Sequence, residues 1–166
     1  EPYRRQRQMC IRDRGYVDIH AHGAWEHSFD DGPEGIDIAR AGHAVHGTTR
    51  QVLSLITNPI DVICANLKNV RAKMDERPDV LGAHLEGPFL ALARKGAHDP
   101  ECLKDPVPEL VDELLGAADG CIRQITISTP PTGPPNTSGA PAAKWSKLLP
   151  AKSTPVPPVF ETTSYA

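Results

Sequence analysis

The alternation of strand-like and helix-like segments between residues 15 and 128 is the feature that most constrains the fold. Short apolar runs rich in β-branched residues predict strands at 16–21, 48–57, 79–85 and 121–128. Helices are predicted between them, at 33–46, at 59–77 and from Pro108 to near Gly120. Strands that alternate with helices form a parallel sheet, because each helix carries the chain back across the sheet. We therefore expect an α/β fold. The pattern alone does not distinguish an open sheet from part of a (β/α)₈ barrel.

The helix predicted at 59–77 has the clearest pattern. Its apolar residues follow one another at spacings of three and four and so lie on one face: Ile60, Ile63, Leu67, Val70 and Met74. Asn58 is suited to cap the start of this helix, with Pro59 at its first position. Pro78 predicts that the helix ends at Arg77.

The two ends of the chain differ from this central part. Residues 1–14 carry a net charge of +3, residues 15–128 carry −8, and residues 129–166 carry +2. Nine of the seventeen prolines lie in 129–166, which shows no strand or helix period, so we expect a disordered Pro-rich tail. The Arg-rich leader includes Met9–Arg14, MCIRDR, which resembles a translated sequencing adaptor. We interpret residues 1–14 as a non-native or disordered leader and 15–128 as the folded domain.

Composition excludes several classes of protein. The net charge of −3 argues against a nucleic-acid partner, since nucleic-acid binding needs a basic face. No apolar run approaches the roughly 18 residues of a membrane helix, so we expect no membrane partner. The four cysteines form no C-x-x-C pair and no disulfide framework, which favours a reducing cytoplasmic location.

Two histidines end the first predicted strand. His20 and His22 are two residues apart, so both rings project to the same side of a strand. Paired imidazoles at the carboxyl end of a parallel strand suit a divalent metal, and ordinary strand histidines are the alternative. Asp18 lies on the same side and could accept a hydrogen bond from a ligating imidazole.

Glu86 ends the third predicted strand and is followed directly by Gly-Pro. The carboxyl edge of a parallel sheet is where α/β folds place their sites, so Glu86 is a candidate metal ligand. A capping or loop glutamate is the alternative. The next loop, 94–100, carries two cations and His98, which could bind substrate or lie in a plain solvated loop. His43 and His46 are expected on a solvated helix surface.

Four segments carry a family resemblance. In order they are VDIHAHGA at 17–24, HGTTRQVLSLIT at 46–57, VLGAHLEGPFL at 80–90 and RKGAHDP at 94–100. Together they resemble the N-acetylglucosamine-6-phosphate deacetylases, metal-dependent barrels of the amidohydrolase superfamily. The resemblance covers residues 15–128. It implies a partial TIM-like barrel made of its first four or so βα units.

The resemblance also implies roles for individual residues. His20, His22 and Glu86 match the metal ligands of family members that have the histidine pair, with zinc or iron as the metal. Ala97 and His98 match the segment that contacts the amino sugar. The implied reaction is hydrolysis of the acetamide of N-acetylglucosamine 6-phosphate, with an aspartate as general base. The implied partners are a small amino-sugar phosphate and, for a full-length relative, a second copy of the chain in a homodimer.

The chain also departs from the family pattern. It has no histidine after His98 and no aspartate after Ser128, so the general-base aspartate and two further ligand histidines are absent. The abrupt change of composition suggests a shifted reading frame or a truncation just after Ile127. We therefore expect a fragment that is inactive alone. Two alternatives remain: an amidohydrolase acting on another amide, and a non-catalytic αβ half domain that binds partners through its Pro-rich tail.

Overall fold

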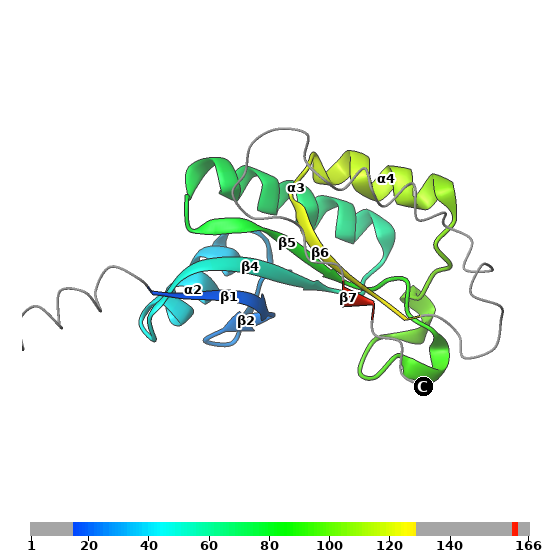
Figure 1. Ribbon diagram of the computed structural model, residues 1–166, viewed down its shortest axis with the longest axis horizontal. Helices are drawn as coiled ribbons and strands as arrows, with labels where there is room; N and C mark the ends of the chain where they lie inside the picture. The colour runs from blue at the N-terminus through cyan, green and yellow to red at the C-terminus, as the bar shows by residue number, and fades with distance from the viewer. Residues whose placement is uncertain (1–14, 129–160, 163–166) are drawn as a thin grey trace, which may run out of the picture.

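The computed structural model describes residues 15–128 and the short strand at 161–162. Its centre is a parallel sheet with the strand order β1-β4-β5-β6-β7 (Figure 1). The strands are β1 Tyr16–Ala21, β4 Thr48–Ile56, β5 Val80–Glu86, β6 Ile122–Ile127 and β7 Glu161–Thr162. A small antiparallel hairpin of β2 Gly23–Ala24 and β3 His27–Ser28 follows β1. The four longer strands confirm the expected parallel α/β fold.

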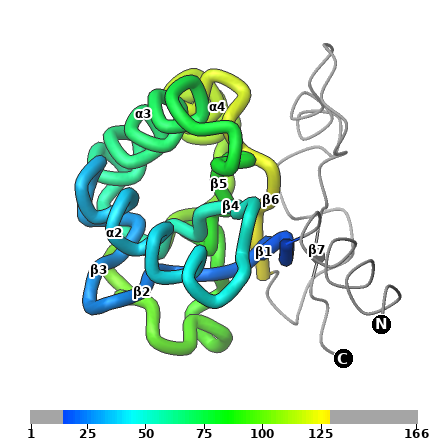
Figure 2. The backbone as a smooth tube through the Cα atoms, turned by 90° about the vertical axis from the view of Figure 1, so that its left-hand side faces the viewer, coloured from blue at the N-terminus to red at the C-terminus, as the bar shows by residue number. Residues whose placement is uncertain are grey.

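The helices α2 Gly32–Ala44, α3 Ile60–Glu76 and α4 Pro108–Ala118 lie together on one side of the sheet (Figure 2). Two single-turn 3₁₀ helices, η1 Leu92–Arg94 and η2 Pro100–Cys102, shape the loop after β5. The predicted helix at 59–77 differs at its start. Pro59 occupies the N-cap position, and the Asn58 side chain instead donates to the carboxylate of Asp30 at 3.4 Å.

The core lies between the sheet and these helices. Alternate residues of β4 and β5 pack against the apolar faces of α3 and α4: Leu53, Leu55, Ala83 and Leu85 against Ile63, Leu67, Val111 and Leu114. Because side chains alternate along a strand, the intervening Ser54 and His84 face the opposite side of the sheet. Glu86, at the carboxyl end of β5, lies on this same face of the sheet.

The sheet is curled, with the helices outside, as in part of a barrel (Figure 1). That these elements are the first four or so βα units of a complete barrel stays a prediction. None of the helices in residues 15–128 is long and apolar enough to cross a bilayer. The predicted leader 1–14 lies outside the described residues. So does the predicted disordered tail, except Glu161–Thr162, which pair with β6 as β7.

Candidate metal centre

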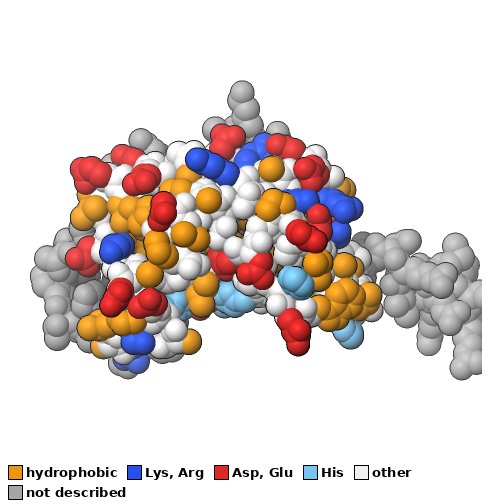
Figure 3. Space-filling model, turned by 180° about the vertical axis from the view of Figure 1, so that it is seen from behind, with side chains coloured by type: hydrophobic (Ala, Val, Ile, Leu, Met, Phe, Trp, Pro, Cys, Tyr) orange, Lys and Arg blue, Asp and Glu red, His pale blue; other side chains and the backbone are white. Residues whose placement is uncertain are grey.

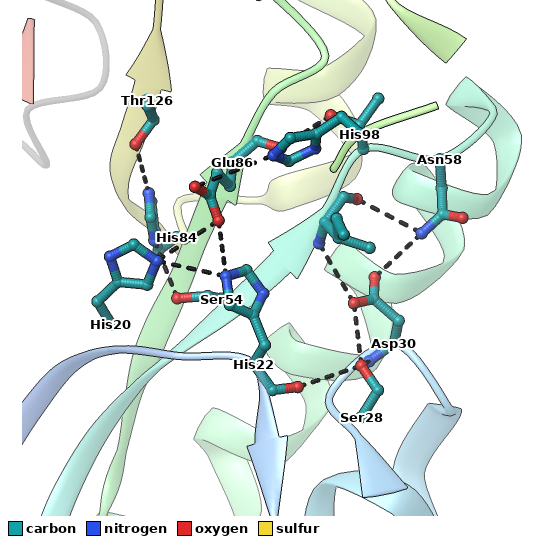
Figure 4. Close-up of polar contacts among 12 residues, drawn as sticks. His20, His22, Ser28, Asp30, Ser54, Asn58, His84, Glu86, His98 and Thr126 are labelled. Atoms are coloured by element: carbon teal, nitrogen blue, oxygen red, sulfur yellow. Dashed lines mark hydrogen bonds and ion pairs between the residues drawn. The ribbon is translucent and has the colours of Figure 1, made fainter. Parts of the chain in front are cut away.

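His20, His22 and Glu86 converge at the carboxyl edge of the sheet (Figure 4). His20 lies in β1, His22 follows that strand by one residue, and Glu86 is the last residue of β5. The two histidine Nε2 atoms are 3.3 Å apart. Glu86 Oε2 lies 3.4 Å from Nε2 of His20 and 2.6 Å from Nε2 of His22. The structure thus brings together the three residues predicted to hold a metal.

The donor atoms suit a small divalent cation. Two donors about 2.0–2.1 Å from a tetrahedral zinc ion lie about 3.3–3.4 Å from each other. The distances from His20 to His22 and to Glu86 match this separation. The shorter distance between His22 and Glu86 is that of a hydrogen bond. Imidazole and carboxylate groups are ligands for both zinc and iron, so the residues fit the expected cofactors.

The charge of Glu86 is stabilised by its neighbours. Burial alone would raise the pKa of this carboxyl, because a half-buried charge loses hydration. Electrostatic interactions with His22, His20 and His98, together with the hydrogen bond from His22, outweigh burial and lower the pKa. Glu86 is therefore a carboxylate at neutral pH, the form that binds a cation.

His98 faces the same carboxylate from the loop after β5. Its Nε2 lies 4.0 Å from Glu86 Oε1, on the side away from His20 and His22. The ring is buried and its Nδ1 has no hydrogen-bond partner among the described residues. Burial lowers the pKa of His98, so the ring is neutral at pH 7. Ala97 beside it is exposed. The proposed substrate contacts thus lie next to the candidate ligands.

The backbone around the two histidines is fixed from α2. His43 Nε2 lies 3.0 Å from the carbonyl oxygen of Gly23, and its Nδ1 lies 3.7 Å from Asp18 Oδ2. Asp18 Oδ1 accepts from the backbone N–H of His20 at 3.0 Å. Asp18 therefore contacts the backbone of His20 and the ring of His43, whereas we expected it to contact a ligating ring. His43, expected on a solvated surface, is partly buried and serves this contact.

Asp30 is a second support that the sequence did not reveal. Its carboxylate accepts hydrogen bonds from the end of β4, from the following loop and from α3: Ile56 N, Asn58 Nδ2 and Asn66 Nδ2. Ser28 Oγ lies 3.2 Å from both Asp30 Oδ2 and the carbonyl oxygen of His22. Burial raises the pKa of Asp30, and these hydrogen bonds partly oppose that shift. The network ties His22 to two elements distant in sequence.

His84 is the third residue whose importance the sequence did not show. It lies on β5 two residues before Glu86, and its side chain is fully buried beneath His20. Burial lowers its pKa to about 4, so the ring is neutral at pH 7. The sequence placed it on the same strand face as Glu86, and only its cross-strand neighbours distinguish it from an ordinary strand histidine. Histidine side chains line this edge of the molecule (Figure 3).

Known proteins with similar sequences are hexosamine-phosphate deacetylases. The N-acetylglucosamine-6-phosphate deacetylase of Bacillus subtilis is 31% identical in an alignment of 138 residues that covers 77% of this chain and 35% of that protein. The Haemophilus influenzae enzyme of the same name is 30% identical over 69% of this chain. N-acetylgalactosamine-6-phosphate deacetylase of Escherichia coli O157:H7 is 29% identical over 68% of this chain. The chain spans about a third of the length of these relatives.

Solved structures give the same result. N-acetyl-D-glucosamine-6-phosphate deacetylase from Mycobacterium smegmatis superimposes with a TM-score of 0.64 and 33% identity, over 69% of this chain and 33% of that one. A mutant of that enzyme in complex with N-acetyl-D-glucosamine-6-phosphate superimposes with a TM-score of 0.65. The enzyme from Pasteurella multocida gives 0.64 at 27% identity. No protein-family model matches the chain.

Proposed function

Since this chain is homologous to a part of the N-acetylglucosamine-6-phosphate deacetylases, we propose that it forms part of the catalytic barrel of such an enzyme. The complete barrel would hydrolyse the acetamide of an N-acetylhexosamine 6-phosphate with the help of a divalent metal. The observation that carries this proposal is the convergence of His20, His22 and Glu86 on one point at the carboxyl edge of the sheet. That edge is where barrel enzymes place their chemistry.

Each group at this edge has a proposed task. His20, His22 and Glu86 would hold the cation, which supplies a Lewis acid and activates water. His98 is neutral and buried beside Glu86. It would donate a hydrogen bond to a sugar hydroxyl or the acetamide, or accept one from it. Ala97 would contact the sugar from its exposed position on the same loop.

The substrate class follows from the relatives. Their names include both the glucosamine and the galactosamine derivatives at similar identity, and these sugars differ at one hydroxyl. A Mycobacterium smegmatis relative has been solved with N-acetyl-D-glucosamine-6-phosphate. We propose an N-acetylhexosamine 6-phosphate as substrate, with glucosamine 6-phosphate and acetate as the products in the gluco case.

We further propose that the chain as given does not turn over substrate. A general base must take a proton from the attacking water and pass it to the leaving amine. The family resemblance places that aspartate on a later barrel strand, beyond the part matched here. Three ligands without the two later histidines should also bind metal weakly.

Metal titration tests the ligand assignment. We expect the full chain to bind one zinc ion weakly in calorimetry, and Glu86→Gln to weaken binding by at least a further tenfold because a charged donor is lost. Glu109→Gln, an exposed acid at the start of α4, is the matched control and should bind as the unaltered chain does. Equal binding by the Glu86 and Glu109 variants would exclude Glu86 as a ligand.

A chimera tests the activity. Residues 15–128 would replace the matched segment of the Mycobacterium smegmatis enzyme, and acetate release from both hexosamine phosphates would be measured. We expect turnover in the chimera, none in the chain alone, and loss of turnover when Glu86→Gln is introduced. A folded, metal-loaded chimera without activity on either sugar would contradict the proposed function.

A further inference from the structure

We propose that His84 is a positioning residue of the metal centre, which holds the imidazole of His20 with its Nε2 toward Glu86. The inference rests on the proposed function for the meaning of that orientation. It concerns a side chain outside the set of candidate ligands. Its basis is the geometry of the fully buried His84 ring and of the exposed His20 ring against it.

The His84 ring is fixed at both of its nitrogens. Nδ1 lies 2.9 Å from Ser54 Oγ on β4, and Nε2 lies 2.8 Å from Thr126 Oγ1 on β6. A hydroxyl can donate or accept, so a neutral imidazole satisfies one partner as donor and the other as acceptor. Both nitrogens are thereby occupied, and neither is available to a cation. The His84 ring is therefore held rigidly by hydrogen bonds to the two strands on either side of β5, and it contacts the His20 ring in this fixed position.

The His20 side chain needs a fixed neighbour to hold it in one rotamer. Its side chain is 46% exposed and belongs to β1, which lies at one end of the strand order. An exposed histidine on an edge strand can adopt several χ1 rotamers, of which one directs Nε2 to Glu86. The ring of His84 meets that of His20 edge to face, with centroids 4.7 Å apart and planes at 81°. This contact favours the rotamer that places Nε2 between His22 and Glu86.

A purely structural His84 would behave differently from a positioning one. If it only fills the sheet interior, its replacement changes the free energy of unfolding and leaves the His20 rotamer as it is. If it positions His20, the rotamer changes in a folded protein. Two variants separate these cases without touching a candidate ligand. His84→Gln can still reach a hydroxyl but lacks the ring. Ser54→Ala/Thr126→Val keeps the ring but removes both of its hydrogen bonds.

The first readout is independent of metal. Three-bond NMR couplings from the backbone nitrogen and carbonyl carbon of His20 to its Cγ report χ1 in the metal-free full chain. We expect couplings of one rotamer in the unaltered protein and averaged couplings in both variants. His46→Gln, at an exposed position after α2, should leave the couplings unchanged. Averaged couplings in the unaltered protein, or one rotamer in a folded His84→Gln protein, would overturn the proposal.

The second readout connects the rotamer to the centre. We expect zinc affinity to fall about 10- to 100-fold in both variants, the effect usual for a residue that orients a ligand. An unchanged affinity despite a changed rotamer would show that His84 does not serve the metal centre and would overturn the proposal. If the unaltered chain binds no zinc, the proposed metal site fails. The couplings then still decide whether His84 orients His20.

Discussion

At the residue scale, the balance between burial and neighbouring groups decides which ionisable side chains carry a charge. His84 and Cys121 are both completely buried, and both have pKa values displaced toward their neutral forms. Glu86 is only partly buried and keeps its charge because histidines surround it. Desolvation outweighs the attraction of nearby opposite charges at His84 and Cys121, whereas interactions with the histidines outweigh it at Glu86.

Cys121 makes this balance measurable far from the metal centre. Burial raises the pKa of its thiol to about 12 from an ordinary 9.0, and Sγ contacts the carbonyl of Leu67. Above pH 9 the unfolded chain loses this proton while the folded chain keeps it, so stability is lost as pH rises. Between pH 8 and 10 this group should cost about 1 kcal/mol of unfolding free energy.

Urea unfolding at both pH values, on Cys121→Ala and on the unaltered chain, checks the prediction. The variant is less stable at either pH because of the cavity, but its loss between pH 8 and 10 should be smaller by about 1 kcal/mol. Cys102→Ala, on the loop after β5, is the matched control and should show the full loss. The same pH dependence in all three proteins would mean that burial does not shift the Cys121 thiol.

At the element scale, the hairpin between β1 and α2 is held against the helix by close backbone approach. Its two turn residues, Trp25 and Glu26, both adopt positive φ angles, of 52° and 64°, which are unusual for residues with a side chain. Gly42 of α2 lies under this hairpin. A Cβ atom at Gly42 would come within 2.7 Å of the Ala24 Cβ and 3.2 Å of the Trp25 ring. His20 and His22 directly precede the hairpin, so its packing on α2 affects their position.

Two glycine-to-alanine changes test this packing against helix propensity. Gly42→Ala should destabilise by about 1–3 kcal/mol through overpacking. Gly116→Ala in α4 meets no atom within 4 Å, so it should stabilise by about 0.5–1 kcal/mol through reduced backbone entropy. Thermal unfolding followed by circular dichroism measures both. If Gly42→Ala raises the midpoint as much as Gly116→Ala does, the hairpin does not pack on the helix as described.

At the scale of the whole molecule, the curled sheet exposes one edge. Among the described strands β1 pairs only with β4, and its outer side chains Val17 and Ile19 are 56% and 47% exposed. An unpaired, apolar edge strand favours association with another chain. The fragment interpretation gives the same expectation, because a barrel would cover this edge with a further strand and helix.

We expect the chain to self-associate with increasing concentration in sedimentation velocity. The double change Val17→Lys/Ile19→Lys should shift the distribution toward monomer, because charges on an edge strand oppose pairing. Val62→Lys/Val107→Lys places the same charges on exposed valines at the helical layer and should not. A monomer at all concentrations before any change would contradict the expectation.

The local periodicities of the sequence by themselves determined most of the secondary structure. Apolar spacing set the course of α3, and Pro78 set its end, because both effects act between residues close in sequence. The two-residue repeat of a strand placed His20 and His22 on one side before any fold was known. The segment motifs pointed to the same three candidate ligands that the structure brings together.

Only the tertiary structure decided which of these features meet. The order β1-β4-β5 brings Glu86 within reach of two histidines more than sixty residues away. The position of β5 between β4 and β6 encloses His84 between Ser54 and Thr126. The sequence predicts a solvated surface for His43 and gives no role to Asp30, because the partners of both belong to other elements. Strand order and burial depend on packing between segments far apart in the chain, and no local pattern encodes such contacts.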